Sequence, residues 1–244
     1  MNYLTKVLFF SSLLFFVNGC GSSDSNNDQE YTYPQEVNGP AGMFEGATEF
    51  VPEMFVDRQT IYAYDKKDAV WIAVVFTPTG EMIYENNTGI EVGSTYDIVN
   101  GKIFVNDSKK SPTITLDSAE KTTWEVTGED NDGAVWQGTW YLELKFKREM
   151  LEGKCYLSKY NDRGEIVNEK VCFKDMTLTS YTLEGEVKQS VAYTLKDNAI
   201  AVTADNGDYT LYLMSITQNT ELNVWYKSDV QNYANNAVWV QTSP

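Results

Sequence analysis

The sequence contains no histidine and is poor in cysteine, proline and basic residues. Its 244 residues include 3 Cys and 6 Pro, and 19 Lys and Arg stand against 35 Asp and Glu. Without His the chain lacks the commonest metal ligand, the usual general base and every Ser-His-Asp triad. The net charge of −16 excludes nucleic acid as an expected partner, because affinity for phosphates comes from Lys and Arg. It argues equally against a peripheral electrostatic attachment to anionic lipid.

Carboxylates are the catalytic groups that remain. A glycosidase needs only two of them, but 35 acidic residues supply many pairs and no pair stands out. Residues 129–133 resemble part of a calcium loop, yet Gly128 and Thr139 stand where its first and last acidic ligands belong. We therefore expect no catalytic residue, no metal site and no cofactor. A carboxylate-based hydrolase is the alternative from the enzyme class.

The chain begins with a segment typical of export signals. Lys6 precedes an apolar run over residues 7–17, which has the length of a signal-peptide core and is short for a membrane span. The run ends at Val17-Asn18-Gly19-Cys20, which resembles the lipobox of bacterial lipoproteins. The resemblance implies that residues 1–19 are removed and that Cys20 is acylated, which anchors a protein stably in a bilayer. An ordinary secretory signal followed by a chance Cys is the alternative.

The residues that follow Cys20 offer nothing apolar to bury. Residues 21–30 are Gly, Ser, Asp, Asn, Gln and Glu, and we expect a flexible tether over residues 20–39. By the same resemblance, Gly21 rather than Asp after the acylated Cys favours the outer membrane over retention in the inner membrane. The expected location is the cell envelope, with the lipid bilayer as a partner through the acyl anchor. Removal of Lys6 with the signal leaves 18 basic and 35 acidic residues, a net charge of −17.

Short runs of strand-forming residues, separated by turn residues, make up the rest of the chain. Residues 69–76 are rich in Val, Ile and Ala and lead into Thr-Pro-Thr-Gly, and Asn100-Gly101 separates two further runs. Such runs between Gly, Asn, Asp and Pro are typical of antiparallel strands, and Asn-Gly is a strong hairpin signal. The pattern predicts an all-β barrel or sandwich.

Cys155 and Cys172 are the cysteines that remain once Cys20 is acylated. An even pair in an exported chain predicts a disulfide. A hairpin centred between Arg163 and Gly164 places residues 155 and 172 directly opposite each other, close to disulfide distance. The alternative is a pair of reduced, buried thiols.

An internal repeat indicates that the same β unit occurs twice. Four short segments recur in the same order, at offsets that drift as loop lengths change. They are 43–46 and 150–153, 95–103 and 192–200, 123–126 and 223–226, and 134–136 and 237–239. Generic similarity between β hairpins is the alternative. The repeat predicts domain 1 over residues 40–147 and domain 2 over residues 148–244.

The second copy resembles the lipocalin-like (calycin-like) domains of bacterial lipoproteins. The resemblance lies in residues 151–153, 171–179, 193–202, 209–213 and 220–226. It implies two similar antiparallel lipocalin-like barrels or half-open sandwiches in tandem. It implies a fold with a cup at one barrel end, not an activity.

Aromatic residues are the best candidates for binding. The chain has 6 Trp, 16 Tyr and 11 Phe, and such side chains stack on sugar rings or line apolar cups. Trp124 with Trp225, and Trp136 with Trp239, are expected in the core because they occupy matching repeat positions. Trp71 and Trp140 have no evident counterpart and are the candidate ligand-binding residues.

These features predict a membrane-anchored, non-enzymatic binding or interaction module. The partner would be a small apolar ligand, a glycan or an envelope protein. The alternative is a structural or accessory envelope lipoprotein without a small ligand.

Overall fold

The computed structural model describes residues 33, 35–65, 70–86, 91–106, 112–162, 165–204, 207–217, 221–228 and 233–242. Residues Tyr31–Pro244 form one compact unit. The expected signal peptide, Cys20 and most of the expected tether lie outside the described residues. Within the part of the chain that is described, no helix is long and apolar enough to cross a membrane.

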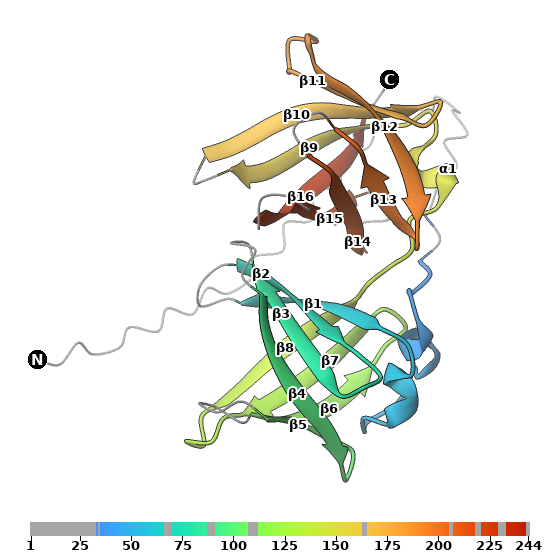
Figure 1. Ribbon diagram of the computed structural model, residues 1–244. Coiled ribbons are helices and arrows are strands. Elements are labelled where there is room, and N and C mark those ends of the chain that lie inside the picture. Colours follow the sequence, from blue (N-terminus) through green and yellow to red (C-terminus); the bar gives the residue numbers. More distant parts are fainter. Residues whose placement is uncertain are drawn as a thin grey trace, which may run out of the picture. The chain divides into compact units, whose positions relative to one another are not determined.

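Barrel 1 is a closed barrel of eight antiparallel strands (Figure 1). Each strand pairs with the next in sequence, and the last strand pairs with the first. Its strands are β1 (Gln59–Asp65), β2 (Val70–Phe76), β3 (Glu81–Asn86), β4 (Glu91–Val99), β5 (Lys102–Asn106), β6 (Thr113–Ala119), β7 (Thr123–Glu129) and β8 (Val135–Leu142). The short 3-10 helices η1 (Pro40–Met43) and η2 (Pro52–Phe55) precede β1.

Barrel 2 repeats this architecture after the short helix α1 (Arg148–Leu151). Its strands are β9 (Cys155–Asp162), β10 (Glu165–Lys174), β11 (Thr177–Tyr181), β12 (Val187–Lys196), β13 (Ala199–Val202), β14 (Tyr209–Thr217), β15 (Glu221–Ser228) and β16 (Tyr233–Thr242). The prediction of two similar antiparallel all-β units is confirmed, and both units are closed barrels. The strands of each barrel lie within one of the two expected domains, whose exact boundaries stay a prediction.

One end of each barrel is covered by the segment that precedes its first strand. In barrel 1 the backbone N–H of Phe50 donates to the Gly101 carbonyl at 2.9 Å, and η2 buries Met54 and Phe55. In barrel 2 the helix α1 buries Met150 and Leu151. We call these the capped ends. We call the opposite ends the loop ends; β1 and β3 of barrel 1 and β9 and β15 of barrel 2 end there.

Aromatic rings fill the capped half of each barrel. Their ring centroids lie 5.0–6.2 Å apart in barrel 1 and 5.3–6.3 Å apart in barrel 2. The rings belong to Phe50, Phe55, Phe76, Tyr96, Trp124 and Trp140 in barrel 1, and to Phe146, Tyr156, Phe173, Tyr193 and Trp239 in barrel 2. Burial of such large side chains is the main favourable term for a fold of this kind.

The repeat segments of the strands fall on equivalent strands of the two barrels. Residues 95–103 lie on β4 and β5, and residues 192–200 lie on β12 and β13. Tyr96 and Tyr193, which match within these segments, are both buried and both pack edge-on against a Phe. The sequence repeat therefore has a structural counterpart.

The expected core positions are correct for Trp124 and Trp239, which lie inside the barrels, and wrong for Trp136. Trp225 is buried, but on the outer side of β15, where it contacts Tyr62 of barrel 1. Trp136 is 37% exposed, whereas Trp124, Trp225 and Trp239 are at most 3% exposed.

In the packed half of each barrel, the inward Trp of the last strand is Trp140, opposite Trp124, and Trp239, opposite Leu222. Trp140 is thus the structural counterpart of Trp239. Trp136 faces the same side of β8 as Trp140, but it lies at the loop end of the barrel, where it stays exposed. The short matches therefore paired residues from different levels of the two barrels.

The disulfide prediction is confirmed. Cys155 and Cys172 pair directly across the β9–β10 hairpin and are joined by a bond of 2.03 Å. The two cysteines alternate with the inward residues Tyr156, Val171 and Phe173, so the bond lies on the outer side of barrel 2.

Candidate functional site

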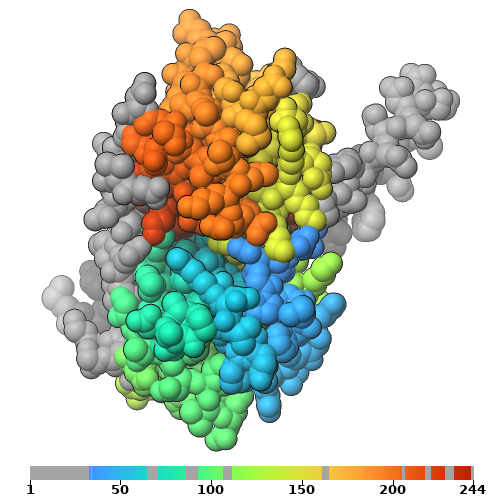
Figure 2. Space-filling view, turned by 45° about the vertical axis from the view of Figure 1, so that its right-hand side comes forward, coloured from blue at the N-terminus to red at the C-terminus, as the bar shows by residue number. Residues whose placement is uncertain are grey.

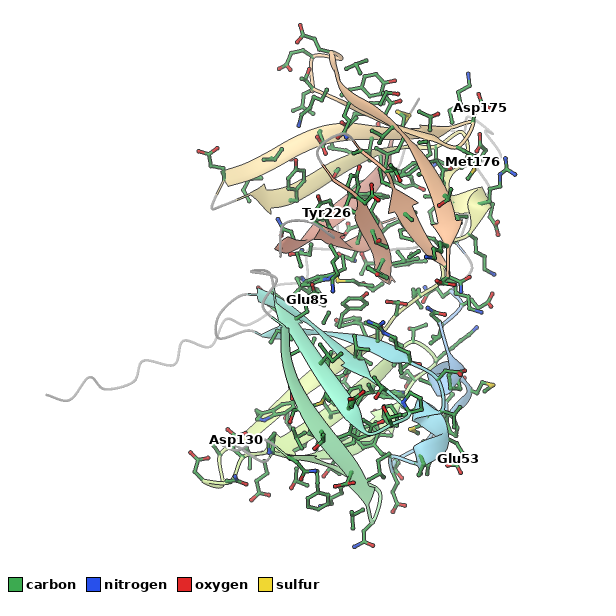
Figure 3. All side chains as sticks on the ribbon, viewed as in Figure 1. Glu53, Glu85, Asp130, Asp175, Met176 and Tyr226 are labelled. Atoms are coloured by element: carbon green, nitrogen blue, oxygen red, sulfur yellow. A yellow bond between two sulfur atoms is a disulfide. The ribbon has the colours of Figure 1, made fainter. Side chains whose placement is uncertain are left out.

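The loop end of barrel 2 carries polar and aromatic side chains on the inward faces of its strands. Glu169 lies two residues before the buried Val171 on β10, and Tyr226 lies two residues after the buried Val224 on β15. Tyr209 begins β14 and pairs with Ser228. Each side chain therefore points to the same side of its strand as the core residues (Figure 3 labels Tyr226).

A ring contact and an ion pair, linked by an electrostatic interaction between Glu169 and Tyr209, form what we call the tyrosine–ion-pair cluster, made of Glu169, Lys188, Tyr209 and Tyr226. The ring centroids of Tyr209 and Tyr226 are 5.0 Å apart, with the ring planes 36° from parallel. The Nζ of Lys188 lies 2.7 Å from Oε2 of Glu169, whose side chain is only 15% exposed. Burial raises the pKa of Tyr209, and the nearby Tyr226 and Glu169 raise it further. The hydroxyl therefore stays protonated at neutral pH.

The arrangement suits recognition better than fold stability. Taking an ion pair partly out of water costs desolvation energy that its mutual attraction barely repays. A charged pair beside tyrosine rings provides hydrogen-bond donors and acceptors next to apolar ring faces. This is the combination that binds the hydroxyls and the C–H faces of a sugar.

The loop end of barrel 1 presents a different inward residue, Trp136. Its indole lies flat against Gly128 on the neighbouring strand, where ring atoms are 2.1 Å from the point that a Cβ would occupy. Only glycine leaves room for the ring at this position. Trp136 keeps 37% of its surface exposed and is a second aromatic surface that sequence reasoning assigned to the core.

A third set of residues joins the two barrels. Tyr62 of β1 packs against Trp225 of β15 at a centroid distance of 6.0 Å, within a buried cluster that also includes Ala73, Met214 and Ala234. Lys227 of β15 lies 3.3 Å from Glu85 of β3 (Glu85 is labelled in Figure 3). We call this set the junction.

A buried carboxylate lies at the junction. Glu143 accepts hydrogen bonds from Nδ2 of Asn38 at 2.7 Å and from the hydroxyl of Tyr62 at 2.9 Å. Burial raises the pKa of Glu143, although these hydrogen bonds lower it in part. The next residue, Leu144, forms bridges with both Val37 and Leu213. The network therefore connects the segment before η1, the linker between the barrels and barrel 2.

The segment before η1 contacts both barrels. The backbone N–H of Asn38 donates to the carbonyl of Glu143, directly after β8. The hydroxyl of Tyr33 lies 2.9 Å from that of Tyr156 on β9, and it also donates to Gln241 on β16. Figure 2 shows this segment in blue, against residues of both barrels.

The structure separates the two tryptophans proposed as ligand-binding residues. Trp140 is 5% exposed and packs against Phe50 and Phe76, so its role in the structure is packing. Trp71 is half-buried between Tyr64 and Tyr141, at centroid distances of 5.4 and 5.5 Å, beside the junction. Their binding of a ligand stays a prediction, and the acylation of Cys20 falls outside the described residues.

Sequence reasoning missed the tyrosine–ion-pair cluster because its members come from four separate strands. The only signal in the local sequence was Glu169, which interrupts the apolar residues Val167, Val171 and Phe173 on the inward face of β10. The described residues contain no group of three or more His, Cys, Asp or Glu placed to hold a metal ion.

Comparison of the chain with protein-family models, with curated proteins and with solved structures finds no match. The site is therefore interpreted from its own residues.

Proposed function

We propose that this chain is an exported, lipid-anchored envelope protein whose second lipocalin-like barrel binds a polar ligand with ring faces, of which a glycan is the best example. The observation that carries the proposal is the tyrosine–ion-pair cluster inside the loop end of barrel 2. The cluster offers hydrogen bonds and stacking surfaces, which serve binding without catalysis.

The ion pair provides the sharpest test of the binding site. In the variant Glu169→Gln/Lys188→Gln, side-chain size is nearly kept and both charges are lost. We expect affinity for the bound oligosaccharide to fall at least about tenfold, because hydrogen bonds to charged groups contribute about 1.5–3 kcal/mol each. An array of neutral and zwitterionic oligosaccharides provides the probes, and calorimetry measures the affinity.

The matched control makes the same chemical change in another ion pair, as Glu85→Gln/Lys227→Gln at the junction. This control should bind like the unmodified protein. Equal losses in the two variants, or no binding by the unmodified protein to any oligosaccharide on the array, would contradict the proposed site.

The anchor is tested separately. We expect the mature protein to begin at Cys20 and to carry acyl chains there, because the leader resembles a lipoprotein signal. Mass spectrometry of the N-terminal peptide should show the added lipid, and Cys20→Ala should leave the leader uncut or the protein outside the membrane fraction. An unmodified Cys20 in the mature protein would refute the anchor and would leave the ligand site untouched.

A second candidate function is supported by the filled capped halves of both barrels. Aromatic rings in mutual contact occupy these regions, which favours a scaffold whose outer surfaces contact an envelope partner. Mass spectrometry of small molecules that co-purify with the body discriminates the two candidates, because a scaffold carries none.

A further inference from the structure

One outer face of barrel 2 combines lysines with exposed apolar side chains. A continuous row of outward residues crosses five neighbouring strands through direct cross-strand pairs. The row consists of Val240, Leu157, Lys170, Tyr181 and Val187. Leu157 and Val240, which pair directly, are 39% and 43% exposed, and Val187 is 61% exposed.

Further lysines extend this row along the same strands. Lys159 follows on β9, and Lys174 and the exposed Ile166 lie at outward positions of β10. We call these residues together with the row the lysine face. None of its three lysines forms an ion pair with a described residue, in contrast to Lys145, Lys147, Lys188 and Lys227.

Among the described residues, the strands of the lysine face, β9 to β12 and β16, carry no outward acidic side chain. The exposed Asp175, Glu184 and Glu186 lie in the turns at its edges. Glu165 and Glu169 belong to the alternate set of β10 positions, which includes the buried Val171 and Phe173. In a chain with a net charge of −16, the fold has gathered basic and apolar groups on one surface.

The proposed anchor is attached close to barrel 2. The described part of the chain begins at Tyr33, whose hydroxyl contacts Tyr156 and Gln241. Tyr156 points into barrel 2 and donates to the Met150 carbonyl of α1, so Tyr33 lies at the capped end of the barrel. Tyr33 lies 13 positions after Cys20 (33 − 20), and 13 residues extend to at most about 45 Å. An acyl chain on Cys20 therefore holds the lysine face within reach of the bilayer.

We propose that the lysine face docks on the anionic phospholipid surface of the membrane that holds the protein. Lysines attract the phosphates, and the exposed Leu, Ile and Val side chains bury themselves among the headgroups and the first methylenes. The acidic remainder of the surface is repelled, and this repulsion selects one orientation of the body. The inference deepens the anchored part of the proposed function, but it is tested without the anchor.

The experiment uses the mature chain, residues 20–244, as Cys20→Ser so that no lipid is attached. Its partition is measured by sedimentation with vesicles of phosphatidylcholine alone and of phosphatidylcholine with about one third phosphatidylglycerol. We expect binding to the mixed vesicles that exceeds binding to the neutral vesicles and declines as salt is added. Each lysine near an anionic surface raises the partition coefficient roughly fivefold. The variant Lys159→Gln/Lys170→Gln should therefore lose about 25-fold.

The control Lys102→Gln/Lys121→Gln makes the same change in net charge at two exposed lysines of barrel 1 and should lose less than about fivefold. Circular dichroism confirms that both variants keep their strands. Equal losses in the two variants, equal binding to the two kinds of vesicle, or no binding to either would overturn the inference. A missing lipid on Cys20 would not affect this measurement, so the two proposals fail independently.

Discussion

Replacing Trp124 with alanine should lower the free energy of unfolding of barrel 1 by about 3–5 kcal/mol, the range for a large aromatic removed from a packed core. Trp124 is fully buried, with Phe50 and Phe55 at centroid distances of 5.7 and 6.0 Å. Its indole N–H has no hydrogen-bond partner, so the loss comes from packing alone. Urea unfolding followed by tryptophan fluorescence measures the change.

Trp136→Ala is the matched control, since it removes the same side chain from the same barrel. Trp136 is 37% exposed at the loop end, and we expect a change of about 1 kcal/mol or less. The repeat in the sequence placed both residues in the core, so the comparison tests whether the loop end of barrel 1 is packed as tightly as its capped half. Similar losses in the two variants would show that Trp136 is buried as deeply as Trp124.

Reduction of the Cys155–Cys172 bond should destabilise barrel 2 by about 3 kcal/mol, the chain-entropy value for a loop of this length. The two cysteines are 17 residues apart and close the β9–β10 hairpin. Without the bond the unfolded chain gains freedom, while the native hairpin keeps its ladder of hydrogen bonds. The fall should appear as a lower urea midpoint in the presence of dithiothreitol.

Cys155→Ser/Cys172→Ser provides the control for the reductant. This variant should unfold at the lower midpoint with and without dithiothreitol, whereas the unmodified protein should shift only when the reductant is present. Free thiols detected in the native, unreduced protein would be incompatible with the bond. So would an unchanged midpoint after complete reduction.

The lysine face shows why the net charge of the whole chain is a poor guide to local contacts. A net charge of −16 argued against attraction to anionic lipid, and that argument holds for the average surface. The fold places Lys159, Lys170 and Lys174 on outward positions and Glu169 on an inward one. Alternation along two strands is enough to separate the charges by sign.

Local patterns in the sequence were sufficient for the class of fold and for the disulfide. Strand-forming runs between turn residues predicted an all-β chain, and the repeat predicted two similar units. The position of the turn at Arg163 and Gly164 placed Cys155 opposite Cys172, because hairpin register depends only on residues close in sequence. Each of these features is decided within about 20 residues of chain, or by comparing one stretch with another.

Barrel closure decided everything that depends on distant residues. It placed Trp140 and Trp239 at equivalent inward positions and left Trp136 at the surface. It also gathered Glu169, Lys188, Tyr209 and Tyr226 from four strands into one cluster. A side chain's face depends on strand parity, and its neighbours depend on which strands close the sheet. A short segment determines neither the face nor the neighbours, since a shift of one residue turns every inward side chain of a strand outward.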